Sequence, residues 1–104
     1  MELNDKEWSE IINSGEAAVI DFSAEAWCGP CRAISPIMDK LTEKYSGILK
    51  VGKINVDDNT ELTSKYNVMS LPTILFFKDG EIVDKQVGVS TEAGIEAKIA
   101  NLLN

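Results

Sequence analysis

The sequence predicts an α/β sandwich, in which helices cover both faces of a central mixed β-sheet. Two observations favour this fold class. Apolar runs suited to buried strands alternate along the chain with segments whose apolar residues recur at helical spacing. Near the C-terminus, Asp79-Gly80 separates two further strand-like segments, and this dipeptide is typical of a tight hairpin. The 104 residues contain no linker, repeat or low-complexity stretch, so we expect a single domain over residues 1–104.

The N-terminal segment predicts a helix followed by a strand. Asn4 and Glu7 resemble a capping box, and the apolar stripe behind them predicts a helix that ends near Gly15. Residues 17–24 form a mostly apolar run, which predicts a strand covered on both faces.

The middle of the chain predicts a crossover unit. From Cys31 onward, apolar residues recur at three- and four-residue steps, which predicts an amphipathic helix that is kinked at Pro36 and ends near Gly47. Residues 48–56 predict a second strand, parallel to the first, because a strand, a helix and a strand in this order form a right-handed crossover. A short helix is expected over residues 60–66.

The C-terminal third predicts the hairpin and a last helix. Residues 73–77 and 81–87 are the expected hairpin strands. Ile95 and Ile99 lie on the apolar face of the last helix. Gly94 is unfavourable in a helix by about 1 kcal/mol, which predicts a loose first turn.

The two cysteines lie three positions apart in Trp27-Cys28-Gly29-Pro30-Cys31, at the junction between the first predicted strand and the second predicted helix. The unpaired N–H groups at a helix start favour a thiolate, so Cys28 is expected to be the attacking sulfur. Cys31 lies one turn further on, nearly on the same helix face, and is expected to close a small disulfide as the resolving sulfur. Such a small ring removes little entropy from the unfolded chain, which favours redox exchange over a structural role.

Three other interpretations of the cysteine pair are weaker. A zinc site needs about four N or S ligands, whereas this chain has two cysteines and no histidine, so we expect no metal within one chain. A metal or iron–sulfur cluster shared between two chains is an alternative that takes two cysteines from each. A purely structural disulfide, or a pair of idle buried thiols, is the third.

The composition argues against several classes of partner. A net charge of −7 argues against nucleic acid, because binding there depends on Lys and Arg that neutralise phosphates. The longest uncharged run, residues 66–77, is twelve residues long and contains Pro72, so no membrane segment is expected. The first twenty residues contain no apolar stretch of signal-peptide length, which predicts a cytoplasmic protein. Arg32 is the only ionisable group besides the thiols in residues 26–38, which indicates an apolar contact surface.

Asp21 lies in the middle of the first apolar strand. A buried carboxylate is costly to ionise, so burial is expected to raise the pKa of Asp21 and to make this group a carrier of a proton. The alternative is a solvated aspartate at the end of the strand.

Together these motifs resemble the thioredoxin family over nearly the whole chain. Trp27-Cys28-Gly29-Pro30-Cys31 matches the active-site sequence of that family at every position. Further matches are Val19-Ile20-Asp21-Phe22 with the strand that carries the buried aspartate, Pro36 with the helix-kinking proline, Lys53-Ile54-Asn55-Val56-Asp57 with the next strand, Leu71-Pro72-Thr73 with the cis-proline loop, and Val87-Gly88 with the glycine beside the active site. The resemblance implies a thioredoxin fold.

The resemblance implies a protein-disulfide reductase and two-electron carrier. Cys28 is the implied nucleophile, which forms a mixed disulfide with the partner, and Cys31 then attacks this bond to release the reduced partner. Asp21 is implied to help deprotonate Cys31. Lys53 is implied to modulate Asp21, and the alternative is an exposed lysine whose stem lies on apolar surface.

The resemblance also implies a docking face for partner proteins. The peptide bond before Pro72 is expected to be cis, with a plain turn proline as the alternative, and the backbone of Leu71 is expected to pair with an extended segment of the partner. The rest of this face is expected to consist of Trp27, Gly29, Pro30, Gly88 and Val89. For Trp27 the alternative is a core aromatic.

By the same resemblance, the disulfide works without a bound cofactor, and a thioredoxin reductase recharges it, either an NADPH-linked flavoprotein or a ferredoxin-linked enzyme. The implied targets are disulfide-containing proteins, and a monomer is expected. Oxidants and isomerases of this fold usually carry histidine between the cysteines, whereas this chain has Gly29-Pro30, which favours a reductant. The alternatives are an oxidase or isomerase in an oxidising compartment, and a structural or regulatory subunit that uses the apolar face without turnover.

Several features depart from the family pattern. Five residues separate Asp21 from Trp27, where thioredoxins typically have four, and Ser23 stands where most have tryptophan. A bulge or a longer loop is expected to absorb the extra residue. The site is expected to be functional but retuned, because a shift of about 1 Å between Asp21 and Cys31 slows proton transfer. Ser70 replaces a common glycine and is expected to narrow access for some partners, and the N-terminal strand is expected to be short.

Overall fold

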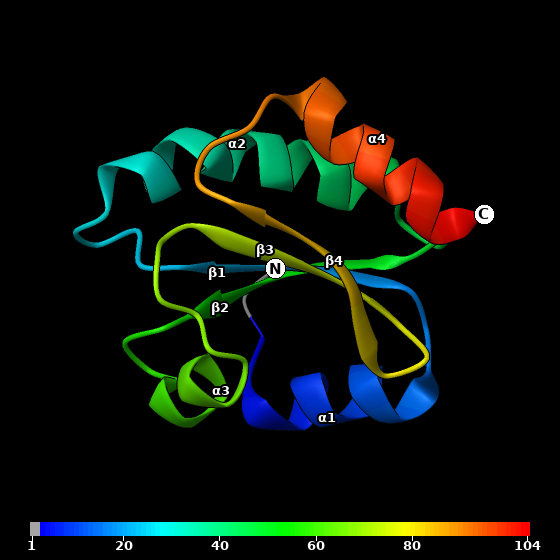
Figure 1. Cartoon of the computed structure of the whole chain (residues 1–104), viewed down its shortest axis with the longest axis horizontal. Helices are drawn as coiled ribbons and strands as arrows, with labels where there is room; N and C mark the ends of the chain where they lie inside the picture. The colour runs from blue at the N-terminus through cyan, green and yellow to red at the C-terminus, as the bar shows by residue number, and fades with distance from the viewer. Residues whose placement is uncertain (1–2) are drawn as a thin grey trace.

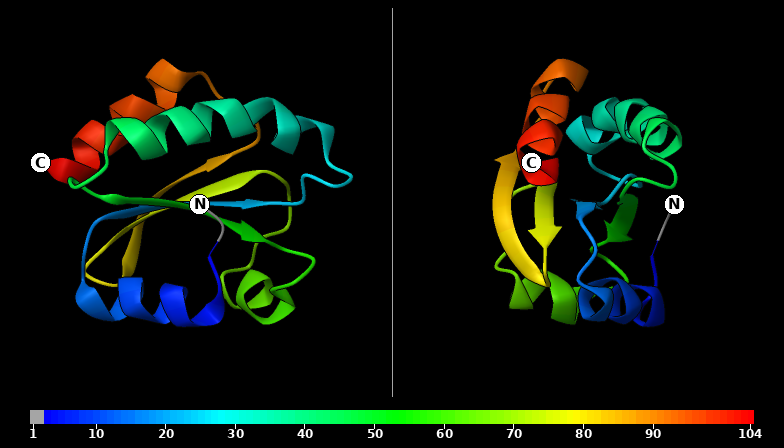
Figure 2. Two further views of the ribbon diagram at one scale, coloured as in Figure 1. Left: turned by 180° about the vertical axis from the view of Figure 1, so that it is seen from behind. Right: turned by 90° about the vertical axis from the view of Figure 1, so that its right-hand side faces the viewer.

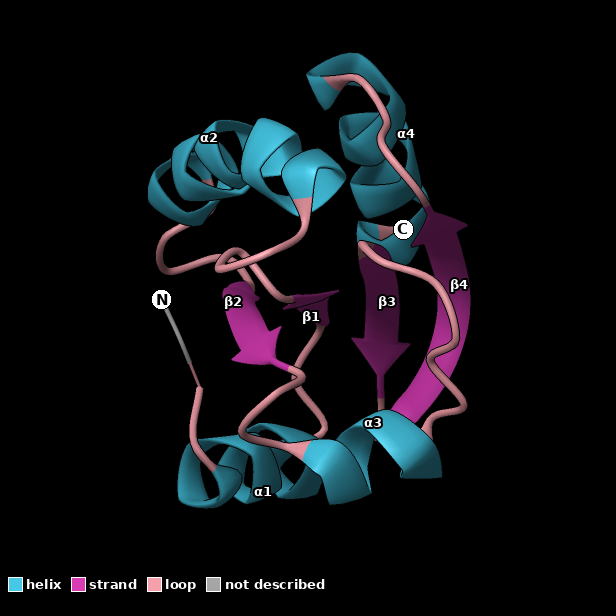
Figure 3. Ribbon diagram, turned by 90° about the vertical axis from the view of Figure 1, so that its left-hand side faces the viewer, coloured by secondary structure: helices cyan, strands magenta, loops and turns pink. Residues whose placement is uncertain are grey.

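The computed structural model describes residues 3–104, which build one four-stranded sheet with two helices on each face (Figure 1). The strand order is β2-β1-β3-β4, with β1 parallel to β2 and antiparallel to β3, and with β3 and β4 forming the hairpin (Figure 3). The predicted mixed sheet is confirmed, and the helices and strands predicted from residue 5 onward are present. The elements are α1 (Asp5–Ser14), β1 (Ala18–Ser23), α2 (Gly29–Lys44), β2 (Lys50–Asn55), α3 (Thr60–Lys65), β3 (Thr73–Lys78), β4 (Glu81–Val87) and α4 (Glu92–Leu103).

The helices α2 and α4 cover one face of the sheet, and α1 and α3 cover the other (Figure 2). Successive side chains of a strand point to opposite faces. On β1, Val19 therefore packs in the core under α2 and α4, whereas Ile20 and Phe22 pack with α1 and α3. By the same alternation Asp21 lies on the α2 side. All six residues of β1 are buried, as the apolar run predicts.

The helix α1 begins with the predicted capping box. The Asn4 side chain accepts a hydrogen bond from the Glu7 N–H (2.9 Å), and the Glu7 carboxylate accepts one from the Asn4 N–H (3.3 Å). The helix is capped at its C-terminus by Gly15, whose φ of 73° is the left-handed conformation that favours glycine. Local sequence signals therefore define both ends of this helix.

The prediction of a loose first turn in α4 is wrong. The Thr91 hydroxyl caps the helix by accepting a hydrogen bond from the Gly94 N–H (3.0 Å). A Cβ atom at position 94 would lie 2.6 Å from the Ser90 hydroxyl oxygen. Glycine lets the capping loop approach closely here, so it tightens the turn that its low helix propensity would weaken.

The chain before α1 contacts the edge of β2 without forming a strand of its own. The Leu3 N–H donates to the Lys53 carbonyl (2.7 Å), and the Leu3 side chain packs over Gly52. Within residues 3–104 no strand precedes β1, so the expected short N-terminal strand is absent from the described residues.

Candidate active site

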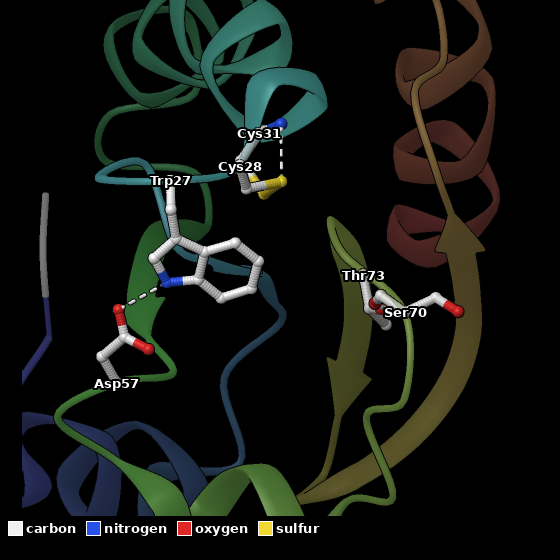
Figure 4. The surroundings of a disulfide bond; sticks show 6 residues. All are labelled: Trp27, Cys28, Cys31, Asp57, Ser70 and Thr73. Carbon is white, nitrogen blue, oxygen red and sulfur yellow. Dashed lines mark hydrogen bonds between the residues drawn. A yellow bond between two sulfur atoms is a disulfide. The ribbon is translucent and has the colours of Figure 1, made fainter.

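The cysteine pair lies where β1 leads into α2, and the sequence prediction of this position is confirmed. Cys28 is the N-cap residue of α2, and its sulfur accepts a hydrogen bond from the Cys31 N–H (3.2 Å). The two residues are joined by a disulfide, with their Cα atoms 5.2 Å apart (Figure 4). Cys28 keeps 6% of its surface exposed, whereas Cys31 is fully buried. Of the two residues, only Cys28 presents surface to a partner.

The extra residue between Asp21 and Trp27 is absorbed in the loop and not in the strand. The carbonyl of Ala24 accepts hydrogen bonds from the N–H groups of both Trp27 (3.1 Å) and Cys28 (2.9 Å), which closes a tight turn. The register of β1 with β2 runs without interruption through Ser23. The longer-loop alternative is therefore confirmed, and a bulge in β1 is excluded.

Asp21 is buried, with 1% of its surface exposed, so the alternative of a solvated strand-end aspartate is wrong. Its Oδ1 atom has no hydrogen-bond partner among the described residues. Burial raises the pKa of Asp21 to about 7, against a smaller lowering by the Lys53 ammonium, and the Glu25 carboxylate adds to the rise. The predicted upward direction of the pKa is confirmed, and the carboxyl group changes its charge near neutral pH.

Lys53 lies opposite Asp21 in the parallel pairing of β1 with β2. Its side chain is only 14% exposed, so the alternative of an exposed surface lysine is wrong. The ammonium Nζ atom lies 2.7 Å from the Ser35 hydroxyl, 3.1 Å from the Asp39 carboxylate and 3.7 Å from the Glu25 carboxylate. Within residues 3–104 it forms no ion pair with Asp21. The sequence predicts none of these three partners, because Ser35 and Asp39 reach Lys53 only through the packing of α2 on β2, and Glu25 reaches it from the loop after β1.

Trp27 lies on the surface beside the disulfide, with 61% of its side chain exposed, so a core aromatic is excluded. Its indole N–H donates to the Asp57 carboxylate (2.9 Å), as Figure 4 shows. This bond fixes the ring next to Cys28 while one face stays open to solvent. Exposed aromatic surface of this kind is typical of a protein contact.

The loop before β3 lies on the other side of the disulfide. The Leu71–Pro72 peptide bond is cis, as the resemblance implies. The Gly88 N–H donates to the Pro72 carbonyl (2.8 Å), which ties the end of β4 to this loop. Val89 follows with an exposed side chain. Gly88, the residue after β4, thus lies next to the proline, and Leu71 packs against the cysteine pair.

A shallow groove of about 500 Å³ runs along the disulfide between the Trp27 loop and the cis-proline loop. It contains the predicted residues Trp27, Gly29, Pro30 and Leu71, and also four that sequence analysis missed, Val56, Thr63, Val68 and Met69. Val68 and Met69 could have been found, because they directly precede the Ser70-Leu71-Pro72 segment. The predicted residues Pro72, Gly88 and Val89 do not line this groove.

The described residues were also compared with the requirements of a metal site and of a membrane-spanning helix. Within residues 3–104 no group of three or more His, Cys, Asp or Glu side chains is arranged to hold a metal ion. In the same part of the chain, no helix combines the length and the apolar character that crossing a membrane requires.

The geometry of the cysteine pair defines a class of protein. Because the disulfide closes within one helical turn, the chain can gain or lose two electrons at Cys28 and Cys31 without rearranging its sheet. A protein with this fold and this site is a thiol–disulfide oxidoreductase. The family model described as Thioredoxin matches residues 1–101, so the chain belongs to the thioredoxin family.

Known relatives agree with this assignment. The chain is 37% identical to the thioredoxin of Alicyclobacillus acidocaldarius over 103 residues, which cover 99% of this chain and 97% of that protein. It is 42% identical over 98 residues to the chloroplastic M-type thioredoxin of Pisum sativum, covering 93% of this chain but 56% of the pea protein. The crystal structure of thioredoxin NaTrxh from Nicotiana alata is similar, with a TM-score of 0.85 at 29% identity, over 97% of this chain and 90% of that one. The predicted thioredoxin fold and the activity of a protein-disulfide oxidoreductase are confirmed.

Proposed function

We propose that Cys28 is the nucleophile and Cys31 the resolving thiol in the reduction of disulfides in other proteins. The observation that carries this assignment is the difference in exposure of the two residues at the start of α2. The Cys28 thiolate attacks one sulfur of the partner disulfide, forms a mixed disulfide and releases the other partner sulfur as a thiolate. The Cys31 thiolate then attacks Cys28 Sγ, closes the internal disulfide and releases the second partner thiolate. Two electrons pass to the partner.

We infer that Asp21 accepts the proton of Cys31 in the second step. The side chain of Asp21 faces the side of the sheet that α2 covers, and α2 carries Cys31 in its first turn. A proton acceptor is most effective when its pKa lies near the working pH, and the pKa of Asp21 is about 7. Lys53 modulates this group from the neighbouring strand.

We infer that the groove at the disulfide and the adjoining end of β4 receive an extended segment of the partner. The groove is lined mostly by apolar side chains, and Trp27 and Met69 expose apolar surface in it. Leu71 offers backbone groups beside the cysteine pair for pairing with such a segment. Recognition through backbone groups is tolerant of partner sequence.

We propose a monomer in the cytoplasm or another reducing compartment, without a bound cofactor, recharged by a thioredoxin reductase. The Gly29-Pro30 dipeptide, without histidine, supports a reductant. The reductase is either an NADPH-linked flavoprotein or a ferredoxin-linked enzyme. Incubating the oxidised protein with each enzyme and its electron donor, and counting free thiols, separates the two.

The roles of the two cysteines are tested by trapping the mixed disulfide. The Cys31→Ser variant is expected to form a covalent adduct with an oxidised test protein, because attack by Cys28 is retained and resolution is lost. The adduct is detected by mass spectrometry and disappears on addition of a reductant. The matched Cys28→Ser variant is expected to form none.

Two outcomes would contradict the proposal. Adducts through Cys31 in the Cys28→Ser variant, with none in Cys31→Ser, would reverse the two roles. Failure of the unmodified, reduced protein to reduce the test disulfide would remove the general reductase function and favour a binding role for the apolar face.

A further inference from the structure

The Lys53 side chain extends across the face of the sheet from a position beside Asp21 to the helix α2. Asp21 and Lys53 are direct partners in the parallel pairing, so their side chains start on the same face of the sheet. The Lys53 ammonium nevertheless makes its shortest contact with the Ser35 hydroxyl, at 2.7 Å, and its next with the Asp39 carboxylate, at 3.1 Å. Both partners belong to α2. The cation is therefore held by the helix and not by its strand neighbour.

Ser35 occupies a defined place relative to the reacting thiol. It lies four residues after Cys31, so both side chains project from the same face of α2 on consecutive turns. Its hydroxyl contributes no charge, yet it makes the shortest of the three contacts of the ammonium. The shortest contact of a nearly buried positive charge is thus made by a neutral group on the helix of the resolving cysteine.

We propose that Ser35 is a positioning residue, which holds the Lys53 ammonium against α2 and so limits how strongly Lys53 stabilises the ionised carboxylate of Asp21. The inference deepens the proposed function, on which its kinetic consequence rests. The Asp21 Oδ1 atom has no hydrogen-bond partner among the described residues. The Lys53 ammonium donates a hydrogen bond to the Ser35 hydroxyl and forms ion pairs with the carboxylates of Asp39 and Glu25, so its contacts are made to groups other than Asp21.

Loss of the Ser35 hydroxyl is expected to redirect the cation. One N–H donor of a side chain that is 14% exposed would lose its partner, which is unfavourable where water is scarce. The unpaired oxygen of Asp21 is then the acceptor on the neighbouring strand that gains most from the free donor. A closer ammonium favours the charged carboxylate, so the pKa of Asp21 falls from about 7.

The charged and titratable groups that act on Asp21 come from three elements. The strand β2 contributes Lys53, the loop after β1 contributes Glu25, and α2 contributes Asp39 through its contact with the ammonium. The partner of Asp21 on β3 is Ile74, which does not titrate. In the oxidised protein, the two cysteines do not titrate either, because they form a disulfide.

The test follows the titration of Asp21 by carboxyl ¹³C NMR in the oxidised, full-length protein. In Ser35→Ala, the midpoint is expected to fall by about 0.5–1 pH unit. Ser35→Thr keeps a hydroxyl and is expected to restore the midpoint. Thr42→Ala is the matched control, because it removes a hydroxyl from the same helix, and within residues 3–104 this hydroxyl bonds the Met38 carbonyl alone (2.8 Å). Its midpoint is expected to equal that of the unmodified protein.

A second set of variants separates positioning from a general structural effect. If Ser35 acts through Lys53, then Ser35→Ala has no effect on the Asp21 midpoint when Lys53 is replaced by Met. The same shift in the Lys53→Met background would overturn the inference. An unchanged or raised midpoint in Ser35→Ala alone would overturn it as well. Alanine is the better helix former, so the variant retains α2.

The kinetic readout distinguishes this inference from the proposed function. The pH profile for release of a partner from its mixed disulfide is expected to move to lower pH in Ser35→Ala, by the same amount as the Asp21 midpoint. A shifted midpoint in a protein that reduces no disulfide would refute the proposed function and leave the positioning role of Ser35 intact. An active protein with an unshifted midpoint would refute the positioning role alone.

Discussion

Phe22 and Asp21 are neighbours on β1, yet their side chains enter two different cores. Phe22 lies in the core under α1 and α3, where its ring centroid is 6.2 Å from that of Trp8. Trp8 in turn packs edge-on against Phe77 and Tyr66, at 5.1 and 5.4 Å. Asp21 enters the core under α2 and α4 with a carboxyl oxygen that lacks a hydrogen bond among the described residues.

The two faces of β1 therefore have different roles: the face under α1 and α3 contributes to stability, and the face under α2 and α4 contributes to chemistry. Edge-on aromatic pairs add about 0.5–1.5 kcal/mol each beyond the burial of their area, so the α1 side supplies stability. A buried carboxyl group without full hydrogen bonding opposes folding once it ionises. On the α2 side, the buried Asp21 lowers the stability of the fold at neutral pH, but it provides a group that exchanges a proton near the cysteines. We therefore expect variants on the two faces of β1 to change the free energy of unfolding in different ways.

The largest effect is expected from Phe22→Ala. The side chain is fully buried, so its loss leaves a cavity in the aromatic core and lowers the free energy of unfolding by up to about 5 kcal/mol. Denaturant unfolding measures the change. In the folded fraction the titration midpoint of Asp21 should stay where it is, because the cavity opens on the opposite face. A midpoint that moves with Phe22→Ala would show that the two cores are not independent.

Asp21→Asn is expected to raise the free energy of unfolding, whereas Phe22→Ala lowers it. The size of this increase depends on pH. The unfolded chain releases the Asp21 proton near pH 3.8, whereas the folded protein retains it up to about pH 7. The folded state therefore binds more protons in this window, and the stability of the unmodified protein falls as the pH rises through it. The amide of Asn does not titrate. Relative to the parent, the variant should gain about 4 kcal/mol between pH 4 and pH 7, and no more above pH 7.

Urea unfolding of both oxidised proteins at a series of pH values measures this gain. Thr42→Ala is a suitable control, because it changes a side chain of α2 without removing a titratable group. Its stability should run parallel to that of the parent across the same pH range. Parallel curves for Asp21→Asn would mean that the carboxyl group ionises in the folded protein as easily as in the unfolded chain.

Much of this architecture was predictable because the signals for it are local. The capping box at Asn4 and Glu7, the hairpin at Asp79-Gly80 and the cysteine pair at the start of α2 each depend on residues within about one turn of one another. The buried position of Asp21 followed from its apolar neighbours in the strand. Short-range patterns of this kind do not require knowledge of tertiary contacts.

The parts that escaped prediction depend on how elements pack. Ser35 and Asp39 reach Lys53 only because α2 lies over β2, and no spacing in the sequence connects these residues. Residues of the groove, such as Thr63 of α3, come close to the disulfide through the fold alone. The prediction of a loose turn at Gly94 was wrong for the same reason. Helix propensity does not show that the capping loop packs closely against this residue.

The smallest change in the free energy of unfolding is expected from glycine-to-alanine variants on the two faces of the sheet. Gly52 lies on the α1 side of β2, where an added Cβ would be 2.9 Å from the Leu3 side chain, whereas nothing lies within 4 Å of one added at Gly29 in α2. Gly52→Ala should therefore lower the free energy of unfolding by about 1 kcal/mol, because Leu3 must move and the packing loosens. Gly29→Ala should change it by less than about 0.5 kcal/mol. Combining Gly52→Ala with Leu3→Ala, which removes the clash, tests the cause. If Gly52→Ala is still as unfavourable when Leu3 is already alanine, then strain in the β2 backbone, and not overpacking against Leu3, limits this face.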